Sequence, residues 1–422
     1  MCCSTPLNIV PPIRAGRSLD QKLAEIRANP SGSKAFILAD AKDADMAAGL
    51  AATGKDAMTG KMRSLNEYRD QMREIIKQGL VDIMLMSAST NDQLTIAERL
   101  FENSTITPAA RANDTTDIHL PAGGTYGAEP SRPFRSATIE QIQSGRCNPM
   151  PQERTQGADL GLYSITPNNR LEFDYPTLEA YREFRIEAEQ KGFRHFLEVF
   201  DPNACGDACP LDLGRFINDL IVRTLAGVPK SGRPTFLKIA YHGPKALEEL
   251  VAYDPSLVVG VLGGSSGTTY DAFKLIEDVK KYGGRAALFG RKINNSEHQL
   301  TFVRFLHAIA NGQIGSLEAT KAYHGELEKL KIKPHRALKE DAEQTLTAAS
   351  YSGTSTAKPQ AAKPAASEAR SVSSSLIAAP VAYPKLSNGS VDFKKMTPAQ
   401  KVAYSRERIR SDGSRANGNG KA

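Results

Sequence analysis

The stretch FLKIAYHGPKALEELVAYDPSLVVGVLGGSSGTTYDAFKLIEDVKKYGGRAALFGRKIN (236–294) decides the fold of this 422-residue chain. It contains three short apolar runs, at 236–241, 256–263 and 285–290, and a segment with helical spacing fills each gap. Buried strands that alternate with helices of this length are typical of βαβ units, whose strands are parallel. The stretch therefore predicts three neighbouring strands of one parallel sheet.

Five similar apolar runs precede this stretch. They cover residues 35–40, 81–88, 106–113, 158–165 and 193–200. Helical patterns occupy residues 64–79, 91–102, 177–191, 212–227, 244–252, 269–282 and, as the final helix, 296–311. Eight apolar runs that alternate with helices over about 300 residues predict a (β/α)8 TIM barrel. A doubly wound parallel sheet is the alternative architecture.

The rest of the chain divides by composition. Residues 1–18 predict an irregular lead-in, and the barrel is expected over 19–348, with a Gly-, Pro- and Thr-rich insertion at 114–157. Residues 349–395 are rich in Ser, Ala, Pro, Lys and Thr, which predicts a disordered linker. A short basic helix and tail are expected at 396–422. This tail either solubilises the chain or docks on a neighbouring subunit or another partner.

The basic charge of the chain belongs to its C-terminal part. The net charge is +7, and residues 351–422 hold 12 Lys or Arg and 4 Asp or Glu, so they alone carry +8. The preceding 350 residues hold 42 basic and 43 acidic side chains and are close to neutral. A nucleic-acid-binding domain is usually basic along one face. The charge distribution therefore does not favour nucleic acid as a partner.

The sequence shows neither a membrane span nor a secretory signal. A membrane-spanning helix needs about 18 or more consecutive apolar residues, and no such run is present. The N-terminus lacks the continuous apolar segment of a signal peptide. The five cysteines, at positions 2, 3, 147, 205 and 209, are odd in number, and the spacing of the last two supports zinc or a disulfide only weakly. We expect free thiols in a reducing cytoplasm.

Lys238 lies between Leu237 and Ile239, inside a run that is otherwise apolar. Catalytic side chains of a barrel lie at the carboxyl ends of its strands, and this lysine belongs to the sixth of the eight. A lysine that loses its hydration has a lowered pKa and can condense with a carbonyl to form a Schiff base. Lys238 is therefore the candidate nucleophile. The alternative is a structural lysine paired with a carboxylate.

The loops after the seventh and eighth runs have the composition of a phosphate site. The first, LGGSSGTT (262–269), precedes a helix, and the second, FGRKIN (289–294), adds two cations. Glycines let backbone amides approach an anion, and barrels often bind phosphate with these two loops. The alternative is that the glycines serve only the turn. The candidate ligands are Gly263, Gly264, Gly267, Arg291 and Lys292.

On these residues the chain resembles the class I (Schiff-base) aldolases of the DeoC, LacD and fructose-bisphosphate aldolase superfamily, in particular its DhnA-type branch. The resemblance is carried by LKIAYHG, the GGS loop and the GRK turn within 236–311, and more loosely by residues back to 35. It implies a TIM barrel with carbon–carbon lyase activity that needs no metal or cofactor, and a homo-oligomer. For this chain it implies a Schiff base at Lys238, an acidic group at Asp40 and a phosphate cradle at Gly263, Gly264, Ser265, Gly290 and Arg291.

The residues after the fifth run depart from the pattern of that superfamily. Its acid/base tyrosine follows strand five, commonly just before a proline, whereas this chain has FDPNA (200–204). A carboxylate near a Schiff base can move protons if its surroundings raise its pKa toward neutrality. Glu198 or Asp201 is therefore expected to take the place of the tyrosine.

The end of the first run also carries charge, in DAKDAD (40–45). Lys42 is expected to pair with Glu198 or to lie close to Lys238, where a second cation lowers the pKa of the nucleophile. The alternative is a solvated loop over these residues.

Several other polar residues are candidates for the barrel mouth. Arg111 and Asp114 end the third run, and His242 follows the sixth, where it either binds substrate or is a plain polar residue of the rim. His119, His195 and His242 have no metal-like spacing to one another. No metal site is expected.

The sequence thus predicts a class I aldolase-like lyase that forms a Schiff base with a phosphorylated ketose or a related keto sugar. One alternative is a catalytically altered phosphosugar-binding barrel with a regulatory or scaffold role. Another is a Schiff-base isomerase, decarboxylase or transaldolase that acts on carbohydrates.

Overall fold

The computed structural model describes residues 16–56, 59–264 and 267–346, together with positions 384, 385, 391, 395–397, 400 and 404. The chain forms two units, Met1–Gln360 and Ala361–Ala422. In the second unit, the amides of Thr397 and Gln400 donate to each other's side chains, at 3.0 and 3.3 Å. The remainder of the expected linker (349–395) and tail (396–422) lies outside the described residues. The first unit contains the barrel.

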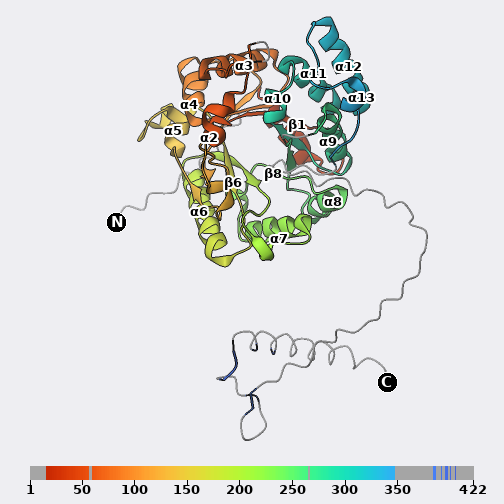
Figure 1. Ribbon diagram of the computed structural model, residues 1–422. Helices are drawn as coiled ribbons and strands as arrows, with labels where there is room; N and C mark the ends of the chain where they lie inside the picture. Colours follow the sequence, from red (N-terminus) through yellow and green to blue (C-terminus); the bar gives the residue numbers. More distant parts are fainter. Residues whose placement is uncertain are drawn as a thin grey trace, which may run out of the picture. The chain divides into compact units, whose positions relative to one another are not determined.

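Eight parallel strands close into this barrel, which Figure 1 shows within its ring of helices. The strands are β1 (Ile37–Lys42), β2 (Ile83–Met86), β3 (Thr107–Arg111), β6 (Leu160–Ile165), β7 (Arg194–Val199), β8 (Leu237–Ile239), β9 (Val259–Leu262) and β10 (Ala286–Phe289). Neighbours in this order are hydrogen-bonded, and β10 returns to β1. Each strand falls within or overlaps one of the eight apolar runs, so the predicted TIM barrel is confirmed.

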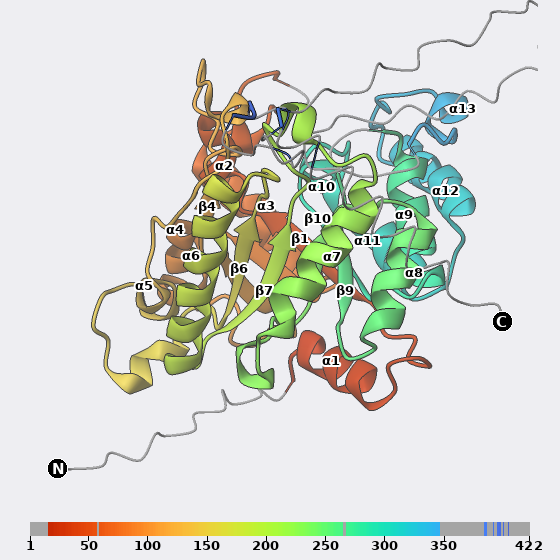
Figure 2. The same cartoon turned by 90° about the horizontal axis from the view of Figure 1, so that it is seen from below.

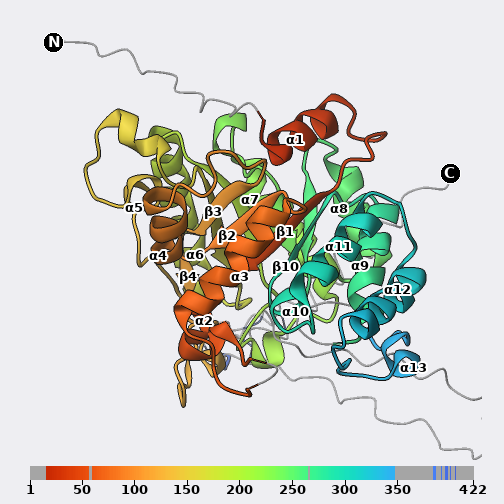
Figure 3. The same cartoon turned by 90° about the horizontal axis from the view of Figure 1, so that it is seen from above.

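Helices cover the outer face of the barrel, as Figures 1 and 3 show. The longer ones are α3 (Leu65–Gln78), α6 (Leu171–Gln190), α7 (Leu213–Ala226), α8 (Pro244–Tyr253), α9 (Thr269–Lys281), α11 (Gln299–Ala310) and α12 (Ser316–Lys329). The shorter ones are α2 (Asp45–Ala48), α4 (Ala88–Asn91), α5 (Ile139–Ser144), α10 (Arg291–Asn294) and α13 (Leu338–Asp341). Short 3-10 turns occupy Gly49–Thr53, Tyr126–Ala128, Pro151–Thr155, Gly206–Ala208 and Lys230–Gly232.

Local sequence signals set several helix ends. Ser64 and Glu67 form a capping box at the start of α3, and Gly79 ends that helix with a φ of 73°. Thr268 and Asp271 form the same kind of box at the start of α9. In a capping box, two amides that have no partner within the helix are satisfied by side chains. The boundaries predicted for these two helices agree with the structure for this reason.

Other helices differ from expectation. The helix predicted at 91–102 begins at Ala88 and continues as a wider helical turn over Asp92–Ala97, after which Arg99 takes a positive φ of 55°. The helix predicted at 296–311 is not the final one, since α12 and α13 follow it. The insertion at 114–157 holds α5 and a two-stranded antiparallel sheet of β4 (Asp114–Thr115) and β5 (Pro133–Phe134).

Alternate residues of each strand fill the inside of the barrel. On β1 these are Ile37, Ala39 and Ala41, so the residues between them face the helices. The same core includes Ile83, Leu85, Ala109, Leu160, Leu162, Phe196, Phe236, Val258, Ala286 and Leu288. This alternation determines which polar side chains can reach the mouth.

A helix that was not predicted closes the amino end of the barrel. α1 (Ser18–Ala28) lies beneath the strands in Figure 2, opposite α2. Its apolar residues Leu19, Leu23 and Ile26 belong to the same core as the inward-facing strand residues. Arg17 anchors the start of α1, because its Nη1 atom donates to the carbonyls of Phe101, Ser104 and Ile106. The barrel interior is therefore plugged at this end.

The expectation of free thiols is wrong for two of the cysteines. Cys205 and Cys209 form a disulfide across the turn Gly206–Ala208, with their Cα atoms 4.9 Å apart. The turn brings the two Cα atoms within the range in which a disulfide forms, which sequence spacing alone does not reveal. Cys147 is a free, exposed thiol. The described residues contain no helix that is long and apolar enough to cross a membrane.

The α1 plug leads to a test of stability. Changing Leu23, which is 2% exposed, to Ala removes apolar contact and leaves a cavity under the barrel. We expect the free energy of unfolding, measured by urea denaturation, to fall by about 3 kcal/mol. Gln21→Ala, at an exposed position of the same helix, is the control and should change it by less than about 0.5 kcal/mol. Equal stabilities of the two variants would show that α1 does not seal the core.

Candidate active site

Lys238 points into the barrel and meets a carboxylate there. It is the middle residue of β8, and its Nζ atom lies 2.5 Å from Oε1 of Glu198 on β7. Glu198 is fully buried, and the side chain of Lys238 is 8% exposed. The two residues are direct partners in the β7–β8 register, so the parallel pairing itself places them side by side. Of the predicted catalytic residues, these two are brought together.

Two further polar residues hold Glu198 in place. Ser164, at the end of β6, donates its hydroxyl to Glu198 Oε2 at 2.7 Å. Arg111, at the end of β3, has Nη2 at 3.5 Å from the same oxygen and donates Nη1 to Ser164 at 3.0 Å. Arg111 was a candidate for the mouth, and it is here. Ser164 was not predicted, although its inward position on β6 follows from the alternation.

Asp43 completes the cluster from β1. Its Oδ2 atom accepts a hydrogen bond from Nε of Arg111 at 2.6 Å. The cluster therefore holds two cations, Lys238 and Arg111, and two carboxylates, Asp43 and Glu198. Each cation contacts a carboxylate, and each carboxylate contacts a cation. Burial of all four side chains is tolerable for this reason, because unpaired charges in the interior are costly.

Asp40 and Lys42 do not join this cluster. Nζ of Lys42 donates to Gln299 at 2.8 Å and to Asn294 at 3.4 Å, and lies 3.8 Å from Asp40. The expected pairing of Lys42 with Glu198 or Lys238 is thus wrong. Asp40 and Lys42 occupy the outward positions of β1, so they contact α10 and α11 rather than the barrel interior.

The Asp40–Lys42 pair is completely buried. Loss of hydration is the largest effect on the pKa of both groups. Desolvation raises the pKa of Asp40 to about 6, against the opposing effect of Lys42. Desolvation likewise lowers the pKa of Lys42. Neither carboxylate oxygen of Asp40 has a hydrogen-bond partner among the described residues. Through Lys42, the pair links β1 to Asn294 on α10 and Gln299 on α11.

The fifth predicted catalytic residue, Asp201, lies two residues past the carboxyl end of β7. Its Oδ1 atom is 2.8 Å from Nε2 of His242, which follows β8. The side chains of Asp201 and His242 are 18% and 14% exposed. Both are therefore reachable from the barrel opening.

A small apolar cluster lies at the mouth near these polar residues. Its members are Ala47, Ile118, Phe200, Ala240 and Leu262. Phe200 and Ala240 come two residues after Glu198 and Lys238 on their strands, and Ile118 belongs to the insertion. Apolar contacts of this kind exclude water and strengthen the electrostatic interactions beside them.

The predicted phosphate residues meet at the ends of β9 and β10. A Cβ on Gly263 would lie 2.2 Å from the ring of Phe289, and one on Gly290 would lie 2.7 Å from the carbonyl of Ala41. Both glycines are therefore required by packing. Gly264 has a φ of 64°, which favours glycine, and Arg291 begins α10. Ser265 lies outside the described residues.

The segment 338–346 packs on the start of α9, beside these glycines. Asp341 Oδ1 accepts from the amide of Thr269 at 2.7 Å, and Asp271 Oδ1 accepts from the amides of Thr345 and Leu346 at 2.9 and 3.1 Å. Nζ of Lys292 donates to the carbonyl of Gly267 at 2.8 Å, and burial lowers the pKa of Lys292 to about 8. The C-terminal segment thus fixes one wall of the candidate phosphate loop.

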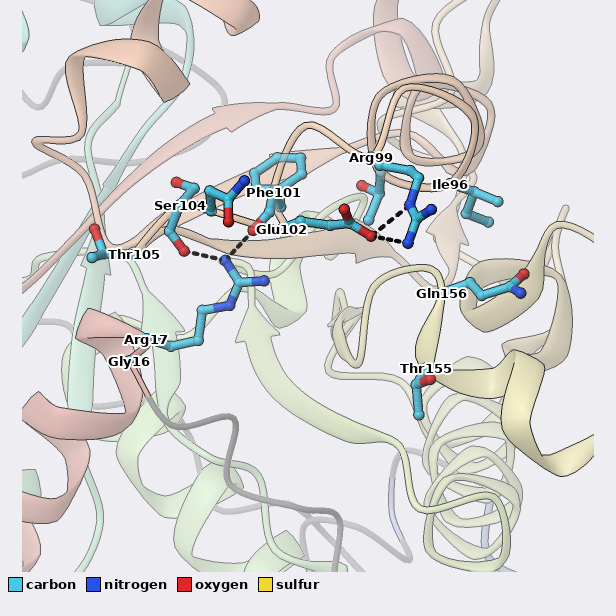
Figure 4. Close-up of a pocket in the computed structure, with 12 residues that line it drawn as sticks. Gly16, Arg17, Ile96, Arg99, Phe101, Glu102, Ser104, Thr105, Thr155 and Gln156 are labelled. Atoms are coloured by element: carbon cyan, nitrogen blue, oxygen red, sulfur yellow. Dashed lines mark hydrogen bonds and ion pairs between the residues drawn. The ribbon is translucent and has the colours of Figure 1, made fainter.

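A large pocket of about 860 Å³ lies elsewhere (Figure 4). Gly16, Arg17 and Thr105 line it, and Thr105 precedes the amino end of β3. It is therefore at the opposite end of the barrel from Lys238. The described residues contain no group of three or more His, Cys, Asp or Glu arranged to hold a metal ion.

Solved structures resemble this fold. An archaeal fructose 1,6-bisphosphate aldolase matches with a TM-score of 0.50 at 15% identity, over 70% of this chain and 99% of that one. A fructose-bisphosphate aldolase from Slackia heliotrinireducens matches with a TM-score of 0.52 at 14% identity, over 73% and 91%. The resemblance to the class I aldolase superfamily is thus confirmed for the fold.

Sequence comparison matches a shorter part of the chain than structural comparison does. No family model matches the chain. A 2-amino-3,7-dideoxy-D-threo-hept-6-ulosonate synthase from Archaeoglobus fulgidus is 33% identical over 91 residues, which is 22% of this chain. The matched stretch spans about a third (34%) of the length of that curated relative.

The buried pair on β1 predicts a pH effect on stability. Because folding raises the pKa of Asp40 from about 3.9 to about 6, its contribution to stability is complete below about pH 4 and is lost as the pH rises through 6. We expect the free energy of unfolding of the wild type to fall, relative to that of Asp40→Asn, between these two pH values. Urea denaturation at half-unit pH steps measures the difference.

The control for this titration is Asp219→Asn, since the Asp219 side chain is 79% exposed. Its stability should follow that of the wild type across the same pH range. A constant difference between the wild type and Asp40→Asn from pH 4 to 6 would contradict the raised pKa of Asp40.

Proposed function

We propose that the protein is a class I aldolase-like lyase, in which Lys238 forms a Schiff base with a phosphorylated ketose or a related keto sugar. The observation that carries the proposal is the contact of Lys238 with Glu198 inside the barrel, at the carboxyl ends of the strands. The likeness of the fold to fructose-bisphosphate aldolases supports it. An archaeal fructose-1,6-bisphosphate aldolase of similar fold, 18% identical with a TM-score of 0.50, has been solved with its catalytic lysine covalently bound to the carbinolamine intermediate of its substrate.

In the proposed reaction, Glu198 accepts a proton from the Lys238 ammonium, which frees the nitrogen lone pair. The amine attacks the ketone carbon and gives a carbinolamine, and loss of water gives an iminium. Removal of a hydroxyl proton then breaks the adjacent C–C bond, whose electron pair moves to the iminium nitrogen and leaves an enamine and an aldehyde. Protonation of the enamine carbon and addition of water release the second product and restore Lys238.

Arg111, Ser164 and Asp43 have supporting roles in this scheme. Arg111 contacts Glu198 and Asp43, and Ser164 donates to Glu198. These contacts fix the direction of the carboxylate that faces the lysine. The loops at Gly263–Gly264 and Gly290–Arg291 would receive the phosphate, since glycines let backbone amides approach an anion and a guanidinium pairs with it.

The same contact favours a second function. A buried lysine held in an ion pair with a carboxylate at 2.5 Å can serve the structure of the barrel alone. The second candidate is therefore a phosphosugar-binding barrel without aldol chemistry. Binding of the sugar without covalent trapping would favour this function over the first.

Reductive trapping tests the nucleophile directly. Incubation with dihydroxyacetone phosphate or fructose 1,6-bisphosphate and borohydride should add the reduced sugar to Lys238, detected by peptide mass spectrometry. Lys238→Met should abolish the adduct because, among the described residues, Lys238 is the lysine whose amine contacts Glu198. Lys245→Met is the matched control, since Lys245 is 89% exposed on α8, and it should trap as well as the wild type. An adduct that persists in Lys238→Met would refute the assignment.

Kinetics on the phosphate loop test the binding of the substrate. Arg291→Met should raise KM for fructose 1,6-bisphosphate by about 10- to 100-fold, with kcat changed by less than about threefold, because a charge-assisted hydrogen bond to phosphate is lost. Unphosphorylated fructose should be turned over equally by both enzymes. Arg215→Met, at an exposed position on α7, serves as the control. An unchanged KM in Arg291→Met would exclude the phosphate role.

A further inference from the structure

A second polar pair follows the Lys238–Glu198 contact along the same two strands. Asp201 lies three residues beyond Glu198, and His242 lies four beyond Lys238. Because Glu198 and Lys238 are partners in register, Asp201 and His242 emerge at the same edge, nearer to the opening. The 2.8 Å contact between His242 Nε2 and Asp201 Oδ1 shows that they meet there.

His242 lies just past the carboxyl end of β8. The strand ends at Ile239, and Ala240, which follows it, belongs to the apolar cluster at the mouth. The side chain of His242 is 14% exposed. His242 therefore lies at the rim of the barrel, beyond Lys238 along the chain.

The surroundings of His242 fix the position of its ring. A Cβ placed on Gly214 of α7 would lie 3.1 Å from His242 Cβ, so that helix packs closely against it. The nearby carboxylate of Asp212 is occupied, because it accepts from the Arg215 amide at 3.0 Å. Among the described residues, Asp201 alone hydrogen-bonds the ring of His242.

This contact also selects the tautomer of His242. A carboxylate can only accept, so Nε2 carries the hydrogen that it shares with Asp201. In the neutral ring, Nδ1 then has a free lone pair. The arrangement is that of a base oriented by a carboxylate.

The carboxylate of Glu198, in contrast, already has three partners. Lys238, Arg111 and Ser164 all contact its carboxylate. It can receive the proton of the lysine, but two cations and a hydroxyl surround it and leave little room for a substrate hydroxyl. The proton steps at the substrate therefore call for a different group.

We propose that His242, oriented by Asp201, is the general acid and base that moves the substrate protons. This rests on the proposed Schiff-base function. Nδ1 takes the hydroxyl proton of the iminium, the C–C bond breaks, and its electrons form the enamine while the aldehyde leaves. The imidazolium then gives that proton to the enamine carbon, which restores the neutral ring and the iminium. Water releases the ketone, so the atoms and protons balance.

The test separates iminium formation from proton transfer. Dihydroxyacetone phosphate is incubated with the full-length protein in D₂O, and deuterium exchange at the carbon beside the iminium is followed by NMR. Borohydride trapping on Lys238 is measured in parallel. In His242→Gln, we expect trapping within about twofold of wild type and exchange reduced by about 10²- to 10⁴-fold. Asp201→Asn should trap normally and exchange at least about tenfold more slowly, because an amide can donate to Nε2 as well as accept from it and so no longer fixes the tautomer.

His307→Gln is the matched control, because this histidine lies in the last turn of α11, where its ring contacts the side chain of Asn311. It should trap and exchange as the wild type does. Exchange within about threefold of wild type in His242→Gln, or a wild type that traps without exchange, overturns the role of His242 and leaves the Schiff base intact. A wild type that does not trap overturns both proposals.

If His242→Gln loses trapping or fails to fold, a second variant is needed. Asp201→Asn then decides, since it keeps the ring in place. Full exchange in that variant overturns the proposal, and slow exchange with normal trapping supports it.

Discussion

The rest of the site depends on one constraint, which is that the ammonium of Lys238 is buried inside a barrel and must have a counter-charge. Glu198 supplies it at 2.5 Å from the neighbouring strand. That carboxylate in turn requires partners, which are Arg111 and Ser164, and Arg111 requires Asp43. Because each charge is satisfied by the next, four strands of the barrel and the residue that follows β1 contribute to a single network. Removing one member would leave another buried without a partner, which is costly.

The first strand shows how the barrel keeps two polar networks apart. Asp43 faces the interior and contacts Arg111, whereas Asp40 and Lys42 face α10 and α11. The two sets are a few residues apart in the chain, but the wall of the sheet lies between them. Lys42 attaches the segment after β10 to the first strand through Asn294 and Gln299.

The sequence predicted the barrel well because eight apolar runs must each be buried, and few architectures bury eight such runs in alternation with helices. Lys238 followed from its place in the sixth apolar run, and Glu198 from its place near the tyrosine that the aldolase superfamily has after strand five. Asp40 and Lys42 were misplaced because the alternation along the first strand was not applied, and the same rule would have indicated Asp43. The spacing of Leu19, Leu23 and Ile26 carried the signal for α1. The Cys205–Cys209 bond depends on the geometry of a turn, which no pattern in the sequence expresses.

Asp271 on α9 and Asp341 on α13 accept hydrogen bonds that join the start of α9 to the segment after α12. These contacts determine where the folded unit ends. A chain cut after α11, where the eighth βα unit is complete, would still contain all eight strands. It would, however, leave Asp271 without the amides of Thr345 and Leu346, and the Thr269 amide without Asp341. The glycine loop would then lose its outer support. The autonomous unit of this protein is therefore longer than the eightfold repeat, and it extends at least to Leu346.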